Sequence, residues 1–384
     1  MPGSASPSRS STARDRMRNV RPPDKILIWL VAGLTLFGIV VLMSASGPLG
    51  HQKYGDSLWY FKHQLINGIL PGIAIFAVMS LIDYRLLRRL AMPALIATIV
   101  LLILVYVPGI GLHIGGSSRW VKIWFLSFQP SEFVKVTFLV YVAAWLAGRH
   151  ERDVKTLERG LLPFLGIMGV VMLLLIKQPN TGSTMVIAGA SLLAYFVAGA
   201  PLIWFVGLGA AGVGLVALLI RLTPYRAQRF MTFLHPELDP SGIGYHINQA
   251  YLAIGSGGLF GLGYGHSRQK YLYLPEVAGD SVFAIIAEEL GFIVAVTFLA
   301  AIVALVWRCL TIARHAPDAF GTYLVTGIAG WIALQSFFNV ASMIGLMPIT
   351  GVTLPFVSYG SSALIALATG CGIVASVSRQ TTRL

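Results

Sequence analysis

Charged side chains are scarce in this sequence. Among 384 residues there are 28 lysines and arginines but only 15 aspartates and glutamates, so charge accounts for 11% of the chain while 56% is hydrophobic. No soluble single domain needs that much apolar surface. The net charge of +13 is not organised as a basic face with interleaved aromatics, which argues against nucleic-acid binding.

Several kinds of functional motif are also lacking. Two cysteines, Cys309 and Cys371, support neither a disulfide framework nor a thiolate metal site. No GxxxxGK[ST] motif and no GxSxG motif occurs, which removes the usual ATP-driven pump and serine hydrolase. The glycine-rich stretch 255–265 holds fragments of a dinucleotide pattern without a βαβ unit, so its glycines instead predict close approach of backbone to backbone or ligand.

Long apolar stretches are what the sequence has in abundance. A membrane-spanning helix needs roughly 20 mainly apolar residues, and about ten stretches meet or approach that length. We therefore predict an all-α polytopic membrane protein with about ten transmembrane helices. The stretches lie at 26–46, 64–82, 90–107, 133–148, 161–176, 181–199, 202–220, 282–307, 323–341 and 361–376.

The distribution of basic residues predicts the orientation in the membrane. Counted from the N-terminus, alternate loops are rich in arginine and lysine, which is typical of cytoplasmic loops and predicts that both termini are cytoplasmic. Residues 1–25 predict a disordered basic cytoplasmic tail, and residues 26–384 a single transmembrane domain. Within that domain, 220–281 forms a large extracytoplasmic loop between spans seven and eight.

That loop is unusual because it places basic residues on the sparsely charged side. Arg226, Arg229 and Lys270 lie in it together with His246 and Glu276. Long loops can escape the charge rule, but arginine and lysine also suit binding of phosphate or pyrophosphate. The loop histidines lack the close spacing of a zinc site, whereas Mg²⁺ or Mn²⁺ bridged by a carboxylate and pyrophosphate would leave almost no sequence trace.

Three predicted spans begin on the same outer face with polar residues. They follow the segments 129–132, 280–281 and 358–362, which include Glu132, Ser358 and Tyr359. Helix N-termini present free N–H groups and partial positive charge, so three converging ends would form a pyrophosphate cradle. The alternative is ordinary helix capping by Ser131, Ser281 and Ser358, and both roles can coexist.

Asp280 is the strongest candidate for a catalytic group. It precedes a long apolar run, where the positive helix end and nearby water favour a carboxylate that can act as a general base. Glu288 and Glu289 follow about 12 Å further along the same helix, turned from Asp280 by about 80° and about 180°. We expect Glu288 to lie nearer the site and Glu289 to belong to a structural ion pair. Glu132 and Lys135 are expected to pair on one helical face, as a structural clamp or as a substrate contact.

These residues occur within a longer ordered set of motifs. The set comprises Arg119-Trp120, Gln129-Pro130-Ser131-Glu132 with Lys135, Gln178-Pro179, Gly244 to Ala250 including His246 and Gln249, Ala253 to Gly258, Gln269-Lys270, Leu274-Pro275-Glu276, Ala287 to Gly291, Asn339 to Gly345 and Ser358-Tyr359-Gly360. In this respect the chain resembles the SEDS family (shape, elongation, division and sporulation; FtsW, RodA and SpoVE) and is most similar to FtsW. Two departures are Gly279-Asp280-Ser281, where the family usually has Thr-Asp-Phe, and Ser361, where it usually has a second glycine.

The resemblance implies a peptidoglycan glycosyltransferase of the bacterial plasma membrane. It implies that the chain polymerises lipid II into glycan strands with inversion and release of undecaprenyl pyrophosphate, at the division septum. The implied partners are a class B penicillin-binding protein and other divisome proteins, and no protein-bound cofactor is required. The implied catalytic residue is Asp280, and the candidate substrate-binding residues are Arg119, Glu132, Lys135, Arg226, Arg229, His246, Gln249, Lys270, Glu276, Glu288, Ser358 and Tyr359.

Three alternatives stay open at this point. A lipid II flippase or transporter would concentrate polar groups at mid-bilayer on interrupted helices, whereas here they gather on one face. A polymerase of the RodA type would serve elongation instead of division. A noncatalytic scaffold explains the hydrophobicity but not the convergent anion-binding groups.

Overall fold

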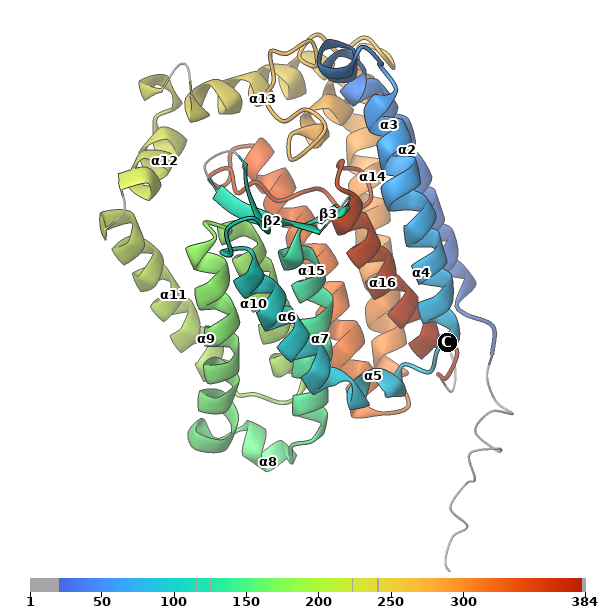
Figure 1. The fold of residues 1–384 in the computed structure, drawn as a ribbon, viewed down its shortest axis with the longest axis vertical. Helices are drawn as coiled ribbons and strands as arrows, with labels where there is room; N and C mark the ends of the chain where they lie inside the picture. Colours follow the sequence, from blue (N-terminus) through green and yellow to red (C-terminus); the bar gives the residue numbers. More distant parts are fainter. Residues whose placement is uncertain (1–20, 115–116, 124–125, 223, 240–241, 382–384) are drawn as a thin grey trace, which may run out of the picture.

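The structure, a computed structural model, describes residues 21–381 except 115–116, 124–125, 223 and 240–241. Most of the predicted basic tail, residues 1–20, lies outside this part of the chain. The remainder folds as a bundle of roughly aligned helices (Figure 1). The helices are α2 (Lys25–Tyr54), α3 (Trp59–Gln64), the π-helix η1 (Leu65–Ile69), α4 (Leu70–Leu81), α5 (Arg85–Arg89), α6 (Ala91–Leu104), α7 (Pro130–Ala147), α8 (Glu151–Val154), the π-helix η2 (Leu157–Leu161), α9 (Leu162–Lys177), α10 (Thr181–Val197), α11 (Leu202–Leu222), α12 (Pro224–Leu234), the 3-10 helix η3 (Pro236–Leu238), α13 (Ile243–Gly257), α14 (Val282–Arg314), α15 (Ala319–Met343) and α16 (Ser361–Ser378).

Each of the predicted apolar stretches coincides with a helix, and the mostly helical class of the prediction is confirmed. Among the described residues, 7 helices are long and apolar enough to cross a membrane, and α6, α10 and part of α11 are shorter apolar helices. The number of spans therefore stays a prediction. Most starts agree within a few residues, because an apolar run that crosses a bilayer must satisfy its backbone as a helix. In contrast, α2 and α14 continue to Tyr54 and Arg314, beyond the predicted ends at 46 and 307.

The helices differ in how much of their surface the protein itself covers. The apolar windows of α7, α15 and α16 are each 72% buried, against 28% for α2 and α14. α15 packs against α7, α10 and α14, and α16 packs against α4, so these central helices form the core. The outer helices instead expose large hydrophobic side chains such as Leu36, Val303 and Leu173. Such apolar surface requires lipid around it.

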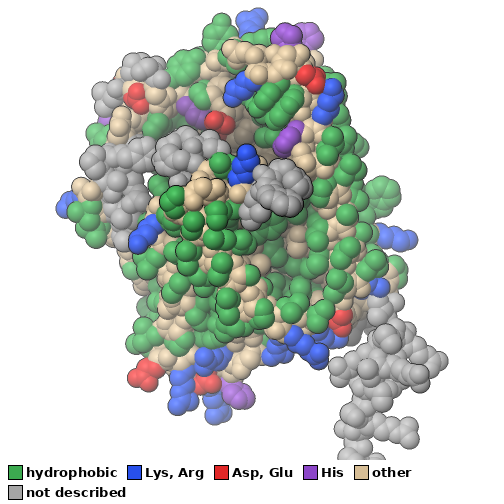
Figure 2. All heavy atoms as spheres, in the orientation of Figure 1, with side chains coloured by type: hydrophobic (Ala, Val, Ile, Leu, Met, Phe, Trp, Pro, Cys, Tyr) green, Lys and Arg blue, Asp and Glu red, His purple; other side chains and the backbone are tan. Residues whose placement is uncertain are grey.

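Polar side chains gather at the two ends of the bundle. Figure 2 shows hydrophobic side chains over the middle of the visible face and Lys and Arg side chains at the end where α5 and α8 lie. We call this the basic end, and the opposite end, at which α7, α14 and α16 begin, the site end. The two described chain ends meet at the basic end, where Arg21 N donates to Arg379 O at 3.0 Å. The exposed basic residues there include Arg88, Arg89, Arg149, Arg152, Lys155 and Arg159.

A small sheet at the site end was not expected for an all-α protein. Strands β1 (Gly111–Ile114), β2 (Ser117–Ile123) and β3 (Leu126–Phe128) pair antiparallel in the order β1-β2-β3. β3 leads directly into α7, so the sheet fixes where that helix begins (Figure 1).

In its described residues the predicted outer loop, 220–281, holds the end of α11, then α12, η3 and α13, before an irregular stretch that returns to α14. That stretch docks on a break in α14, where Gly291 has φ 79° and ψ 177°. Leu262 N donates to Glu288 O at 2.9 Å, and Phe292 N donates to Gly258 O at 3.0 Å. A Cβ at Gly261 would collide with Glu289 O, so the glycine-rich sequence permits the close backbone approach that was predicted.

Candidate active site

The Asp280 segment is held mainly through its backbone. Asn339 Nδ2 donates to Asp280 O at 2.7 Å and also to Val352 O at 2.7 Å. Ser358 Oγ donates to Gly279 O at 2.6 Å. The Asp280 side chain is partly buried, and a Cβ at Gly351 would lie 3.9 Å from its Oδ2 atom. The carboxylate is thus presented beside the backbone that joins α15 to α16.

Further contacts fix the turn on either side of Asp280. Gly279 N donates to Glu276 O at 2.8 Å, and Tyr359 N donates to Ala278 O at 2.7 Å. Ser281 Oγ donates to Pro275 O at 2.8 Å and lies 2.6 Å from His246 Nε2. Of the residues predicted to bind substrate, His246, Ser358 and Tyr359 therefore contact the segment that carries the candidate base.

Three helix N-termini meet around this segment. The starts of α7 and α16 are linked because Gln129 N donates to Ser362 Oγ at 3.2 Å. The start of α14 is linked to the start of α16 through the contacts of Ser358 and Tyr359. At none of the three is the residue before the helix engaged in a side-chain cap, so capping by serine does not occupy these N-termini. The three helix ends keep the partial positive charge that every helix N-terminus carries.

Glu132 and Lys135 form a buried ion pair in the first turns of α7. Lys135 Nζ lies 2.8 Å from Glu132 Oε1, and the two side chains are 2% and 7% exposed. Lys135 Nζ also donates to Gln335 Oε1 at 2.8 Å, and Gln335 Nε2 donates to Thr353 O at 2.9 Å. The pair therefore joins α7 to α15 and to the segment before α16, which is the geometry of the structural clamp.

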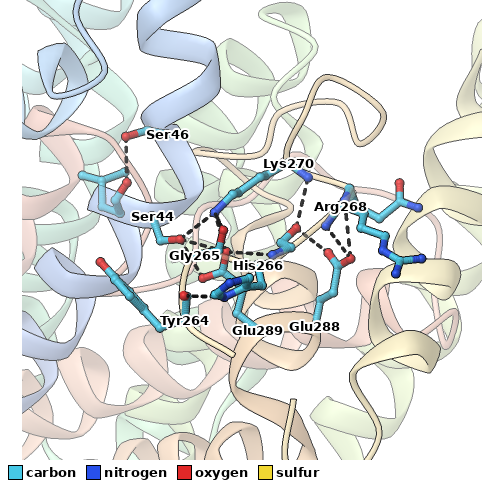
Figure 3. Close-up of polar contacts among 12 residues, drawn as sticks. Ser44, Ser46, Tyr264, Gly265, His266, Arg268, Lys270, Glu288 and Glu289 are labelled. Carbon is cyan, nitrogen blue, oxygen red and sulfur yellow. Dashed lines mark hydrogen bonds and ion pairs between the residues drawn. The ribbon is translucent and has the colours of Figure 1, made fainter. Parts of the chain in front are cut away.

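Lys270, Glu288 and Glu289 gather behind the loop that precedes Asp280 (Figure 3). Lys270 Nζ lies 2.7 Å from Glu289 Oε1, and Glu288 accepts from Arg268 N at 2.9 Å. Glu289 is thus in a buried ion pair, as expected. Both carboxylates contact residues 267–270.

The other candidates are spread over the site end. Arg119, on β2, donates from Nη2 to Pro179 O at 2.6 Å and from Nε to Gln178 O at 3.3 Å. Gln249 lies on α13, and Glu276 is exposed in the turn before Asp280. Arg226 and Arg229 lie on α12, but their side chains fall outside the described part of the chain.

An aromatic cluster packs beside the same turn. The Tyr359 hydroxyl lies 2.8 Å from His63 Nδ1, and the Tyr359 ring meets Tyr60 edge-on at 4.9 Å. Burial raises the pKa of the Tyr359 phenol, so its proton stays on the oxygen and the hydroxyl can donate to His63. These contacts join the start of α3 to the start of α16.

Sequence reasoning missed Asn339, Gln335 and His63 as parts of this site. Asn339 and Gln335 are buried amides on the apolar helix α15, and burial of an amide indicates a required hydrogen bond. That signal appears only once the helix is known to be central. Among the described residues no cluster of three or more His, Cys, Asp or Glu side chains could hold a metal ion.

Known proteins match this chain in sequence and in fold over nearly its whole length. Residues 25–383 match the FtsW/RodA/SpoVE family, described as "Cell cycle protein". The chain is 38% identical to a "Probable peptidoglycan glycosyltransferase FtsW" of Trichlorobacter lovleyi, over 92% of this chain and 93% of that protein. It is also 38% identical to "Stage V sporulation protein E" of Bacillus subtilis, over 93% of this chain and 97% of that protein.

Solved structures agree with these relatives. A chain in a structure described as "Structural coordination of polymerization and crosslinking by a peptidoglycan synthase complex" superposes with a TM-score of 0.76 at 29% identity, covering 93% of this chain and 98% of that one. The Thermus thermophilus rod shape determining protein RodA gives a TM-score of 0.69 at 28% identity, covering 94% and 98%. The fold, the ordered motifs and the extent of these matches show that the chain belongs to the FtsW/RodA/SpoVE family of polytopic membrane proteins.

Proposed function

We propose that this protein is a peptidoglycan glycosyltransferase that polymerises lipid II, with Asp280 as its general base. The observation that carries the proposal is the fixation of Asp280 at the start of α14, through backbone contacts from Asn339, Ser358 and Tyr359. These contacts fix the place of the Asp280 backbone at the helix start, and a general base must be held in a defined place to accept a proton. The names of the FtsW relatives support the same activity.

In the proposed reaction the 4-hydroxyl of an acceptor sugar attacks the anomeric carbon of the growing glycan. The hydroxyl oxygen forms the new glycosidic bond, its proton passes to a carboxylate oxygen of Asp280, and the bond from the anomeric carbon to the diphosphate oxygen breaks. Undecaprenyl pyrophosphate leaves with the bonding electrons, and the anomeric configuration inverts. General-base catalysis of this kind typically contributes about 10² to 10⁴ to a rate.

The departing diphosphate needs positive charge close to it. We propose that the N-termini of α7, α14 and α16 supply part of that charge and that Arg226 and Arg229 on α12 supply the rest. Pre-oriented donors of this kind stabilise the charge that develops in the transition state more than they stabilise the bound substrate. A divalent cation would arrive with the diphosphate, because such ions keep most ligands as water and substrate oxygen.

The remaining candidates divide into two groups under this proposal. Gln249 and Glu276 contact the substrate. Residues already engaged with other parts of the protein hold the site in shape instead, as the contacts of Arg119, Lys135 and Tyr359 indicate. The members of this second group are Arg119, Glu132, Lys135, His246, Lys270, Glu288, Ser358 and Tyr359.

We further propose that the site end faces the cell exterior and that both termini are cytoplasmic, because exposed Lys and Arg gather at the basic end. Both native cysteines are buried, so a single cysteine introduced at Glu276 can be labelled selectively. A membrane-impermeant maleimide should label it in intact cells. Labelling only after permeabilisation would show that the site end faces the cytoplasm.

The relatives also suggest where the reaction takes place. We propose that the protein acts at the division septum with a class B penicillin-binding protein and other divisome proteins, in keeping with its FtsW relatives. A fluorescent fusion should collect at mid-cell, and the penicillin-binding protein should copurify in mild detergent. A uniform distribution along the side wall would favour an elongation role.

A direct assay separates the polymerase from a flippase or a scaffold. The purified full-length protein, with its partner where needed, is given labelled lipid II in detergent, and a translocation assay is run in proteoliposomes. Glycan strands without translocation are expected. Translocation without strands would identify a flippase, and neither activity would leave a scaffold.

A further inference from the structure

A buried cluster of charge fastens the loop before Asp280 to two helices at once. The Lys270 side chain is 4% exposed, and its Nζ atom donates to Glu289 Oε1 at 2.7 Å, to Gly265 O at 2.8 Å and to Ser44 Oγ at 3.0 Å (Figure 3). Ser44 belongs to α2 and Glu289 to α14. One ammonium group therefore joins α2, α14 and the loop.

The two adjacent carboxylates hold different parts of the same loop. Glu289 accepts from Ser44 Oγ at 2.7 Å and from Ser267 N at 3.3 Å. Glu288 accepts from the Ser267 hydroxyl and from Arg268 N at 2.9 Å. Glu288 and Glu289 are 1% and 3% exposed, so water does not replace these contacts. The stretch 267–270 is consequently fixed through both backbone and side chains.

The break in α14 makes this arrangement rigid. Gly263 N donates to Glu289 O at 3.0 Å, where a continuous helix would bond to its own next turn. The loop thus supplies hydrogen bonds that the broken helix lacks, and a shift of the loop by one residue would leave buried polar groups unpaired. The chain then runs from Lys270 through 271–279 to Asp280, whose own segment is held by Asn339 and Ser358.

We propose that Lys270, Glu289 and Ser44 form a positioning lock that sets the place of Asp280 relative to α2 and α14. The inference rests on the proposed glycosyltransferase activity and deepens it. The lock fixes one end of the segment 271–280. Asn339 on α15 and Ser358 before α16 fix the other end. Lys270, which its sequence setting marks as a diphosphate ligand, thereby acts through Asp280, because its ammonium is already surrounded by three protein acceptors.

Stability and positioning can be separated for a buried ion pair. Removing one partner leaves an uncompensated buried charge and destabilises a protein strongly, whereas removing both charges while keeping volume is often neutral for stability. A double variant, Lys270→Met with Glu289→Gln, should therefore fold like the wild type. If Lys270 and Glu289 contributed only to stability and not to the position of Asp280, the folded double variant would also keep the wild-type rate.

The chain offers a matched control at the other end of the same two helices. Arg308 on α14 lies 2.5 Å from Asp24, which precedes α2. The double variant Arg308→Met with Asp24→Asn removes a charge pair between the same elements, but at the basic end. A general loosening of α2 from α14 would affect both double variants alike.

The experiment compares kcat and KM for lipid II polymerisation by the full-length protein, together with thermal stability in detergent. We expect the Lys270/Glu289 double variant to keep its melting temperature and KM while kcat falls about 10-fold to 100-fold, the scale of a displaced catalytic group. The Arg308/Asp24 control should keep kcat within about 2-fold.

A milder variant covers the case in which the double variant fails to fold. Ser44→Ala deletes one hydroxyl without leaving a charge unpaired and should lower kcat about 3-fold to 10-fold at unchanged KM. A wild-type kcat in the folded double variant, or in Ser44→Ala when the double variant does not fold, overturns the lock. Failure of the wild type itself to polymerise lipid II would instead overturn the proposed function.

Discussion

Asn339 shows how a single buried amide can fix the position of a catalytic residue by bonding to its backbone carbonyl. Its Nδ2 atom donates to both Asp280 O and Val352 O. The amide therefore joins the start of α14 to the segment between α15 and α16. A hydrophobic residue at this point of α15 would remove the donor from both carbonyls.

We expect Asn339→Ala to lower kcat about 10-fold, because the Asp280 backbone loses a hydrogen bond that fixes its place. Loss of satisfied buried carbonyls should also cost about 1–3 kcal/mol of stability. Steady-state kinetics and thermal unfolding in detergent test both effects. Ser336→Ala is the control, because that hydroxyl donates to Ile332 O within the same helix. An equal loss of kcat in this control would contradict the assignment.

Glycine is required for different reasons at Gly261 and Gly265, in the loop before Asp280. One reason is a positive φ, and the other is close contact with another backbone segment. Both have positive φ, 81° and 83°, but a Cβ at Gly261 would strike Glu289 O, whereas one at Gly265 would meet nothing within 4 Å. Gly265→Ala should cost only about 1–2 kcal/mol, the strain of a left-handed alanine. Gly261→Ala should cost more than about 3 kcal/mol, because the backbone itself must move. Equal melting temperatures in detergent for the two variants would show that the close contact is absent.

At the scale of elements, the spans were predictable because lipid imposes a simple rule. Any apolar run long enough to cross a bilayer forms a helix. The predicted stretches 282–307 and 323–341 therefore begin within a few residues of the first residues of α14 and α15. The β1–β3 sheet was missed because its strands are short and carry no long apolar period. Asp280 stood out by its place before a span, but the partners of its backbone come from α15 and α16 and no local pattern reveals them.

The contact between the start of α5 and the start of α15, at the basic end, predicts that stability depends on pH. Burial alone would raise the pKa of Asp318, but hydrogen bonds from Gly321 N, the Tyr84 hydroxyl and Arg85 together lower it below its usual value. A carboxyl whose pKa is lowered by folding adds stability above its unfolded pKa and loses it as pH falls through the folded pKa.

Asp318→Asn keeps a residue that can cap α15 but removes the charge. The variant should therefore melt below the wild type at pH 7, and the gap should close as the pH falls below about 4. Melting curves of both proteins in the same detergent over that range measure the gap. A gap that is constant with pH would mean that the Asp318 charge does not contribute.

At the scale of the whole molecule, the two ends of the bundle have different chemistry. The basic end carries exposed arginines and lysines that suit anionic lipid headgroups, and the site end brings three helix N-termini around one carboxylate. Apolar surface lies between them. A substrate with a polyprenyl tail and a sugar head would therefore keep its tail in lipid and its head at the site end.

The central claim is that Asp280 accepts the proton of the acceptor hydroxyl. The most direct measurement compares wild type and Asp280→Asn, an isosteric change, in lipid II binding and in glycan strand synthesis by the purified protein. We predict unchanged binding and a rate reduced by at least about 10²-fold, the loss expected for a missing general base. Glycan synthesis by Asp280→Asn at the wild-type rate would contradict the account.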